Sequence, residues 1–187
     1  MAEPIRAFLA LEIPAAVKAE LAAGRESLRA DLPRARWVRP EGQHLTLKFL
    51  GDSQRDVLAA LAADLAPRLA GLGPVTVTLG GSGFFPSSAR PRVAWLGGTA
   101  EGVAPVVEVV EEVAETHGFP RERRPWSLHL TQARLERPWP QVPVGRFLAW
   151  GESLRPPPFT CREAVLFSSR LERGGAVYTP LDRMSLT

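Results

Sequence analysis

The chain has 187 residues, of which 45% are hydrophobic and 23% are charged, a composition typical of a globular protein. It excludes a disordered chain, a collagen and a coiled coil, and the length favours one domain or two small lobes that share a core. The 23 Lys and Arg residues against 20 Asp and Glu give a net charge of +3, which suits binding of a polyanion but is too small for a histone-like protein.

The number of cysteines and the lengths of the apolar runs exclude further classes of protein. Cys161 is the single cysteine, so the sequence predicts neither a disulfide framework nor a cysteine metal site. The opening residues MAEPIRAFLALEIP lack the pattern of a secretory signal peptide. No apolar run approaches the roughly 20 residues that cross a bilayer. We therefore expect a cytoplasmic protein that does not bind membranes.

The first half of the chain predicts a β-α-β-α-β series. Apolar residues recur at helical spacing after Pro14, whereas the segments on either side alternate as strands do. The predicted elements are strand 5–11, helix 15–32, strand 43–50, helix 54–70 and strand 74–79. Along 43–50 the alternation is strict, so the polar side chains share one face, namely His44, Thr46 and Lys48.

The second half repeats this order. Its predicted elements are strand 92–96, helix 101–117, strand 127–135, helix 144–150, strand 160–168 and strand 176–181. The segments GGSGFFPSSARP and LRPPPF are predicted loops, with a hinge between the halves within 80–91. We expect an α+β fold of bilobal, duplicated β-α-β-α-β units whose antiparallel sheets face a central cleft. Residues 1–187 would form a single two-lobed domain with pseudo-repeats at about 1–85 and 86–187.

One tripeptide occurs at the same place in both halves. Two of the three histidines belong to His44-Leu45-Thr46 and His129-Leu130-Thr131. Residues two apart in a strand point the same way, so each copy sets an imidazole beside a hydroxyl. A single copy would be an ordinary polar pair on a sheet, but two copies at duplicated positions indicate a site.

Paired imidazoles suit in-line displacement at phosphorus. One neutral imidazole takes a proton from the attacking oxygen, and a protonated one gives a proton to the leaving oxygen. Threonine hydroxyls and nearby arginines would stabilise charge on the non-bridging oxygens.

The contexts of the two tripeptides carry a family resemblance. The segments are RAFLALEIP, RWVRPEGQHLTLKFLG, GSGFFPSSARPRVAWLG, RPWSLHLTQARL and SSRLERGGAVYTPL. Through these segments the chain resembles the two-histidine phosphoesterase superfamily, and within it the bacterial and archaeal RNA 2′,3′-cyclic phosphodiesterases, also called 2′-5′ RNA ligases.

The resemblance implies a site and a reaction. His44, Thr46, His129 and Thr131 would line a cleft between two pseudo-symmetric lobes. The reaction would be hydrolysis of 2′,3′-cyclic phosphate ends of RNA to 2′-phosphomonoesters without a metal or other cofactor, with reversible 2′-5′ ligation as a related activity. Arg134 completes the family pattern H-x-T-x-x-R.

Two points about Arg134 follow from the residues themselves. Strict alternation would turn Arg134 away from His129, so it reaches the cleft only through a twist, a bulge or a strand end. Its positive charge near the second motif would lower the pKa of His129 and favour the neutral form. The sequence therefore predicts His129 as the base and His44 as the acid.

Other polar and aromatic residues have two interpretations each. His117 is expected to cap a helix, and Glu41 is either a solvated carboxylate or a group that orients His44. The aromatic residues are expected in the core, with stacking on a base or contact with the cleft as the alternative: Phe8, Trp37, Phe84, Trp126 and Tyr178. The arginines upstream of the two motifs are either solvated or a track for the RNA backbone: Arg36, Arg39, Arg121, Arg123 and Arg124.

Three other functions remain as alternatives. The same chemistry can act on a small cyclic nucleotide instead of RNA, and the cleft can bind RNA without turnover. A zinc enzyme is disfavoured because two distant histidines and one cysteine, without a carboxylate cluster, do not build a zinc site. We expect a monomer with no obligate protein partner.

Overall fold

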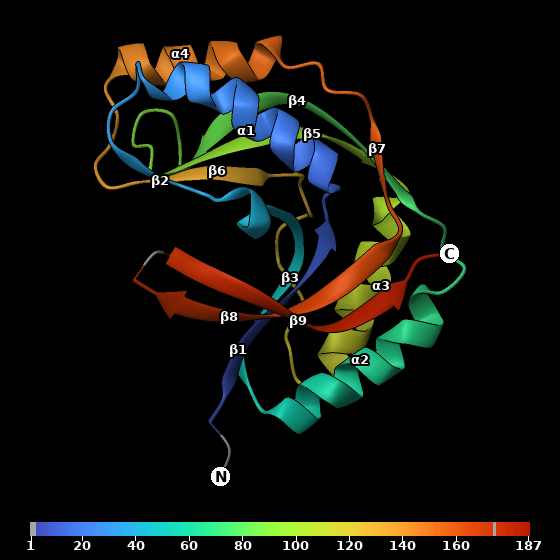
Figure 1. Ribbon diagram of the computed structural model, residues 1–187. Helices are drawn as coiled ribbons and strands as arrows, with labels where there is room; N and C mark the ends of the chain where they lie inside the picture. Colours follow the sequence, from blue (N-terminus) through green and yellow to red (C-terminus); the bar gives the residue numbers. More distant parts are fainter. Residues whose placement is uncertain (1–2, 174) are drawn as a thin grey trace.

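The computed structural model describes residues 3–173 and 175–187. Two antiparallel sheets lie one above the other in the view of Figure 1. The lower sheet has the strand order β3 (His44–Ser53), β1 (Ile5–Glu12), β8 (Glu163–Glu172) and β9 (Gly175–Ser185). The upper sheet has the order β2 (Ala35–Trp37), β6 (Leu130–Leu135), β5 (Val93–Glu101), β4 (Val75–Phe85) and β7 (Phe159–Cys161).

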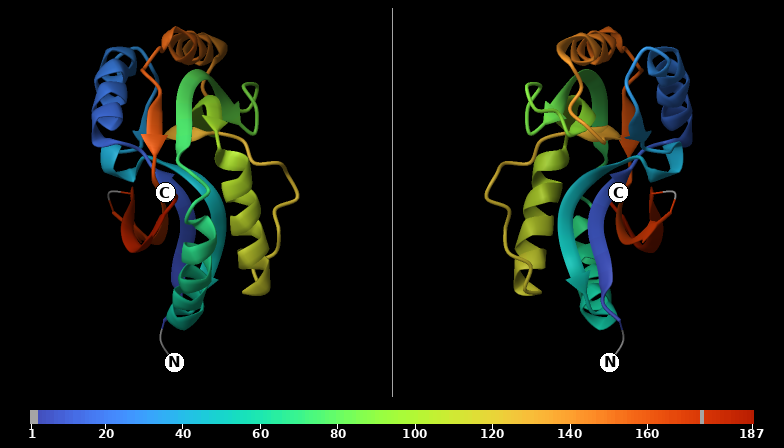
Figure 2. Two further views of the ribbon diagram at one scale, coloured as in Figure 1. Left: turned by 90° about the vertical axis from the view of Figure 1, so that its right-hand side faces the viewer. Right: turned by 90° about the vertical axis from the view of Figure 1, so that its left-hand side faces the viewer.

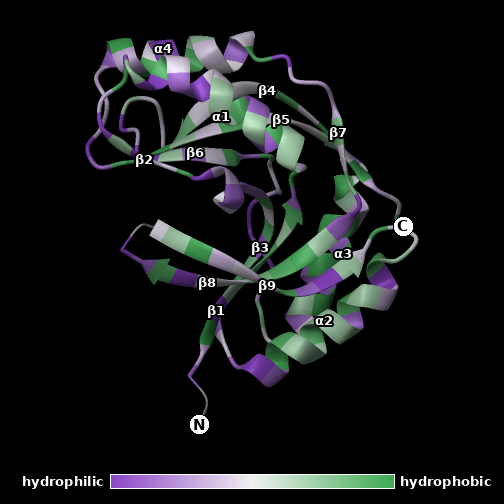
Figure 3. Cartoon of the chain, in the orientation of Figure 1, coloured by the Kyte–Doolittle hydropathy of each residue, from purple (hydrophilic) through white to green (hydrophobic). Residues whose placement is uncertain are grey.

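Four α-helices in the described chain cover the outer sides of the sheets. Helices α2 (Arg55–Leu69) and α3 (Val103–Thr116) lie with the lower sheet, and α1 (Ala15–Arg29) and α4 (Gln141–Ser153) lie with the upper one (Figure 1). A short 3₁₀ helix, η1 (Pro40–Gly42), precedes β3. Hydrophobic and hydrophilic residues alternate along the helices in Figure 3, as expected for helices with one buried face.

Strands from each half of the chain lie in both sheets. Strand β4, from the first half, pairs with β5 in the upper sheet, and β8, from the second half, pairs with β1 in the lower sheet. Each sheet therefore contains strands of both halves in matching order. The expected α+β fold with two antiparallel sheets is confirmed. Because of the exchange, neither half builds a sheet alone, and the repeat boundary near residue 85 stays a prediction.

Several predicted strand boundaries are wrong because the pairing between strands decides where they begin and end. The strand predicted over 160–168 is two strands, since β7 pairs with β4 in one sheet and β8 with β1 in the other. Residues 80–85, predicted as loop and hinge, belong to β4, which continues to Phe85 after a register shift between Leu79 and Ser82. The strand predicted from 127 begins at Leu130. Strand β2, with 3 residues, is too short for a periodic signal.

The largest core cluster contains residues of both sheets and of α2 and α3. Leu9 and Leu11 of β1 are fully buried there, together with Leu61 of α2 and Val106 of α3. A separate small cluster of Phe8, Ala10, Val165 and Phe167 occupies the opposite face of β1 and β8, with Tyr178 packed against it. This second face of the lower sheet carries the first motif.

Candidate active site

A bulge re-aims the side chains of the first motif. Thr46 pairs with Ala10 and Lys48 with Leu9, so Leu47 is an extra residue without a partner in β1. Beyond the bulge Phe49 pairs with Phe8. Phe49 therefore shares the face of His44 and Thr46, and Lys48 turns to the face of Leu45. The sequence-based expectation that Lys48 lies beside His44 is wrong because alternation breaks at this bulge.

The second motif has a bulge at the corresponding place. Thr131 pairs with Trp95 and Ala133 with Ala94, so Gln132 is the extra residue. Arg134 pairs with Val93, which lies two residues from Trp95 and so on the same face. Arg134 therefore shares the face of Thr131, which strict alternation would not allow. In the duplicated pattern, Phe49 occupies the position that corresponds to Arg134.

Two side-chain hydrogen bonds join the motif segments across the sheets. The indole Nε1–H of Trp126 donates to the carbonyl of Thr46 at 2.8 Å. The Gln43 amide donates to Oε1 of Gln132 at 3.3 Å, and both glutamines are buried. Thr46 and His129 line one cavity of about 440 Å³. The two motifs are thus held together at this cavity.

Both imidazoles are oriented by the same backbone contact. Nδ1 of His44 lies 2.9 Å from the carbonyl oxygen of Gly42, and Nδ1 of His129 lies 3.0 Å from that of Ser127. A carbonyl only accepts hydrogen bonds, so Nδ1 carries a proton in each ring. In the neutral ring Nε2 is then the nitrogen without a proton. Gly42 and Ser127 were missed by sequence reasoning, although each stands two residues before its histidine.

The first histidine is enclosed by aromatic rings. Phe8 lies 4.6 Å from His44 between ring centroids, and Tyr178 meets it edge-on at 4.9 Å. Phe8 thus belongs to the buried cluster and also supports the imidazole. Tyr178, for which contact of the hydroxyl with the cleft was the alternative to a place in the core, packs its ring against the imidazole.

This enclosure lowers the pKa of His44 to about 4. Burial is the largest cause, and the positive charges of Lys18, His129 and Arg134 add to it, against the opposing Gly42 hydrogen bond. His44 is therefore neutral at pH 7. The charge of Arg134 acts on His44 across the cleft, whereas the sequence predicted its effect on His129. This favours His44 as the base, the reverse of the sequence-based assignment.

The second histidine has a different aromatic neighbour. His129 directly precedes β6 and meets Phe85 edge-on at 5.3 Å between ring centroids. Phe85 is itself 40% exposed. The two histidines therefore share a backbone contact but differ in the aromatic rings around them, which breaks the pseudo-symmetry of the duplicated motifs.

The other polar and aromatic residues named in the sequence analysis lie outside the two motifs, in or beside a helix or in the core. His117 ends α3, but its Nε2 lies 2.9 Å from Oδ2 of Asp64 on α2 instead of capping the helix. Glu41 is exposed in η1, and the carbonyl of Gly42 next to it orients His44. Trp37 and Phe84 belong to the upper core around Trp139.

The arginines upstream of the motifs differ in their contacts. Arg121 pairs with Glu108 at 2.9 Å and with Glu115 at 3.0 Å. Arg36 stands directly opposite Arg134 in the β2–β6 register. Within residues 3–173 and 175–187, no carboxylate pairs with these exposed arginines: Arg36, Arg39, Arg123, Arg124 and Arg134.

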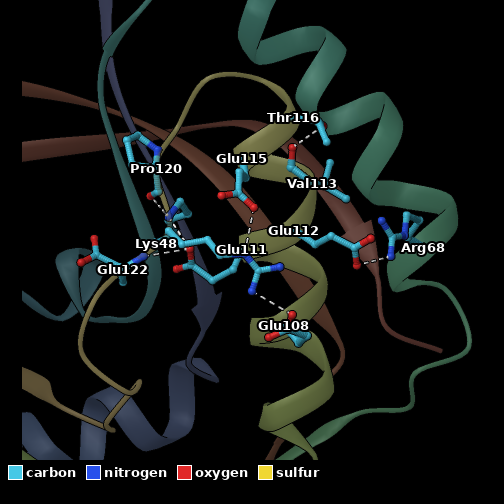
Figure 4. Close-up of polar contacts among 11 residues, drawn as sticks. Lys48, Arg68, Glu108, Glu111, Glu112, Val113, Glu115, Thr116, Pro120 and Glu122 are labelled. Carbon is cyan, nitrogen blue, oxygen red and sulfur yellow. Dashed lines mark hydrogen bonds and ion pairs between the residues drawn. The ribbon is translucent and has the colours of Figure 1, made fainter.

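A buried ion pair supports the segment that leads to the second motif. Lys48 Nζ donates to Oε2 of Glu111 on α3 at 2.6 Å and to the carbonyl of Pro120 at 2.8 Å (Figure 4). The backbone N–H of Glu122 donates to the same Oε2 at 3.1 Å. Lys48 thereby connects β3 to α3 and to the segment 117–129 that carries Trp126 and His129. Sequence reasoning missed this role because it assigned Lys48 to the wrong face.

The described residues contain neither a cluster of metal ligands nor a helix that could span a membrane. No three or more His, Cys, Asp or Glu side chains gather closely enough there to hold a metal ion. None of the helices has the length and apolar character needed to cross a membrane.

Comparisons with known proteins agree with this geometry. A family model described as LigT-like phosphoesterase matches residues 11–95. The RNA 2′,3′-cyclic phosphodiesterase of Thermus thermophilus is 34% identical, with 97% of this chain and 90% of that protein covered. The RNA 2′,3′-cyclic phosphodiesterase of Escherichia coli is 31% identical, with 100% and 99% covered.

The fold comparison agrees with the sequence comparison. The crystal structure of E. coli LigT complexed with 3′-AMP matches with a TM-score of 0.74 and 28% identity over 99% of both chains. The fold and these similarities define a phosphoesterase with two antiparallel sheets. The chain belongs to the LigT-like phosphoesterase family.

Proposed function

We propose that the chain is a hydrolase that opens the 2′,3′-cyclic phosphate ends of RNA to 2′-phosphomonoesters, with His44 and His129 as catalytic residues. Relatives named RNA 2′,3′-cyclic phosphodiesterase support the substrate class. The observation that carries the proposal is the repeated contact between Nδ1 and a carbonyl two residues upstream, which leaves Nε2 of both imidazoles for proton transfer.

The proposed proton transfers follow from the two environments. Neutral His44 takes a proton from water through Nε2 while the water oxygen attacks phosphorus in line with the bond to the 3′ oxygen. The P–O3′ bond breaks, and Nε2–H of protonated His129 donates to the departing 3′ oxygen. The product keeps the phosphate on the 2′ oxygen. The next cycle begins once a proton has moved from His44 to His129 through solvent.

Three further side chains would stabilise the phosphate. The hydroxyls of Thr46 and Thr131 share faces with the catalytic histidines, and Arg134 adds a positive charge on the Thr131 face. Donors placed around a phosphoryl group stabilise the charge of the transition state, and loss of one costs up to about 3 kcal/mol of barrier. We propose these three residues as substrate-binding groups.

Substrate size defines the second candidate function. E. coli LigT, a relative of this chain, has been crystallised with 3′-AMP, which favours a phosphodiesterase of small cyclic nucleotides as the alternative. The values of kcat/KM for a cyclic-phosphate mononucleotide and for an oligoribonucleotide with the same end separate the two candidates. Ligation of 2′-5′ ends would be a related reverse reaction, and the expected cytoplasmic location and monomeric state stay predictions.

The direct test is incubation of a 2′,3′-cyclic-phosphate RNA with the protein, followed by mapping of the product. We expect a 2′-phosphate end. His44→Ala and His129→Ala should each lose about 10² to 10⁴-fold in kcat, whereas His117→Ala, which removes an imidazole at the far end of α3, should change kcat little. A comparable loss at His117 would contradict the assignment of the site.

A second experiment separates the two catalytic roles. A substrate with a much better leaving group than the 3′ oxygen no longer needs protonation of that group. On this substrate His129→Ala should recover far more activity than His44→Ala. The opposite pattern would restore His44 as the acid.

A further inference from the structure

A cavity of about 440 Å³ extends from His129 and Thr46 along the free edge of β3. Residues of β3, of α3 and of the segment 117–129 line it. In Figure 2 this segment leaves the end of α3 and returns to β6. Thr46 and His129 line it near the reacting groups, and Arg123 and Arg124 line it farther along the segment. Its volume falls within the range of small-molecule sites, roughly 300 to 1,000 Å³.

Two cations in this cavity, Arg123 and Arg124, have no carboxylate partner among the described residues, whereas Lys48 and Arg121 do. Lys48 is bound to Glu111, and Arg121 is bound to Glu108. Among the residues that the structure describes, no carboxylate pairs with Arg123 or Arg124, and Glu122 is the one further acid in the lining. The segment therefore presents two available guanidinium groups, which match phosphate oxygens well.

An exposed aromatic ring borders the same cavity. Phe49 is 60% exposed and lines the cavity, and its ring centroid lies 6.1 Å from that of Phe8. The bulge at Leu47 brings Phe49 to the face of His44, at the position where the second motif carries Arg134. An exposed phenylalanine beside unpaired arginines has the chemistry of a single-stranded nucleic-acid site, where bases stack on rings and cations hold the backbone.

The number of phosphates in a substrate indicates which molecule this cavity binds. A cyclic-phosphate mononucleotide has a single phosphate, which the two histidines take. Arg123 and Arg124 therefore suit a second phosphate, which an RNA end carries on the 5′ oxygen of its last nucleotide, where the strand continues.

We propose that this cavity binds the nucleotide preceding the cyclic-phosphate end of an RNA strand, with its base on Phe49 and the linking phosphate beside Arg123 and Arg124. This inference rests on the proposed function and adds a preference for a strand over a mononucleotide.

Three substrates test the proposal: adenosine 2′,3′-cyclic phosphate, the same nucleotide with a 5′-phosphate, and the dinucleotide ApA with a 2′,3′-cyclic phosphate. For the unaltered protein, kcat/KM should rise about tenfold with the 5′-phosphate and about tenfold again with the preceding nucleotide, within the range known for single stacking contacts. Equal values for all three substrates would overturn the proposal. Turnover of none of them would instead refute the proposed function itself.

Variants show which residues produce each of the two gains in kcat/KM. The double variant Arg123→Gln, Arg124→Gln should abolish the gain from the 5′-phosphate, and Phe49→Ala should abolish the further gain from the preceding nucleotide. Arg55→Gln, which changes an exposed arginine at the start of α2, is the matched control and should keep both gains. If the variants lowered kcat/KM by the same factor for all three substrates, these residues would not form a subsite.

Salt dependence gives a second readout that misfolding would not imitate. Each phosphate contact to a single strand contributes about 0.7 to the slope of log affinity against log salt concentration. For the dinucleotide, whose one linking phosphate both arginines would contact, the slope of log KM should therefore fall by about 0.7 in the double arginine variant and stay the same in Phe49→Ala. An unchanged slope in the double variant would show that the arginines do not contact the linking phosphate.

Discussion

Removal of one partner of the Lys48–Glu111 pair should strongly destabilise the protein. The Lys48 side chain is 1% exposed and that of Glu111 10% exposed, with 2.6 Å between Nζ and Oε2. Breaking a buried pair from one side costs about 3 to 5 kcal/mol, because the remaining charge stays buried. The cost of Lys48→Met should lie at the lower end of this range, because Glu111 still accepts a hydrogen bond from the N–H of Glu122 and keeps some contact with water. Glu111→Leu should fall at the upper end, since Lys48 keeps only the Pro120 carbonyl.

Equilibrium unfolding in guanidinium chloride measures these costs. At this chain length each kcal/mol corresponds to about 2 to 4 °C in Tm, so Lys48→Met should lower Tm by about 10 °C. The double variant Lys48→Met, Glu111→Leu should recover most of the loss, since no charge remains buried. Arg68→Met is the matched control, because it breaks an exposed pair between α2 and α3 and should barely shift the midpoint. The reasoning would be refuted if Lys48→Met cost no more than Arg68→Met, or if the two buried substitutions were additive.

Three further predictions concern His44, metal ions and Trp126. The pKa of His44 is about 4 in the folded protein against an ordinary 6.5, so the unfolded chain binds more protons between these values. The free energy of unfolding should therefore fall by about 2 kcal/mol between pH 7.5 and pH 5 because of this group. Unfolding curves of His44→Gln should lack this part of the pH dependence. Hydrolysis should survive EDTA; a loss restored by a divalent ion would exclude the proposed metal-free mechanism. Trp126→Phe should cost about 1 kcal/mol of stability by removing the hydrogen bond to Thr46, and an unchanged unfolding midpoint would show that this bond is not needed.

Local sequence features predicted much of the fold. The long helices follow from apolar residues at helical spacing and from Pro14, and the motif strands follow from alternation. The duplicated His-Leu-Thr tripeptides also indicated both histidines from sequence alone. These features depend on residues within a few positions of one another, where backbone geometry and side-chain periodicity decide the outcome.

Tertiary structure decided which way the side chains of the motifs point. The bulges at Leu47 and Gln132 depend on pairing with β1 and β5, which lie far away in the sequence. They place Phe49 and Arg134 on the faces of the histidines and bury Lys48 against Glu111. No periodicity within a strand contains this information, because an extra residue is defined only against its partner strand.

The roles of the two histidines also depend on packing. The tripeptides are identical in sequence, and both imidazoles make the same backbone contact. His44 is enclosed by Phe8 and by Tyr178, which comes from β9 near the end of the chain. Sequence alone therefore predicted that the two imidazoles form a pair. Only the folded chain decided which aromatic rings enclose His44, and burial is the largest cause of its lowered pKa.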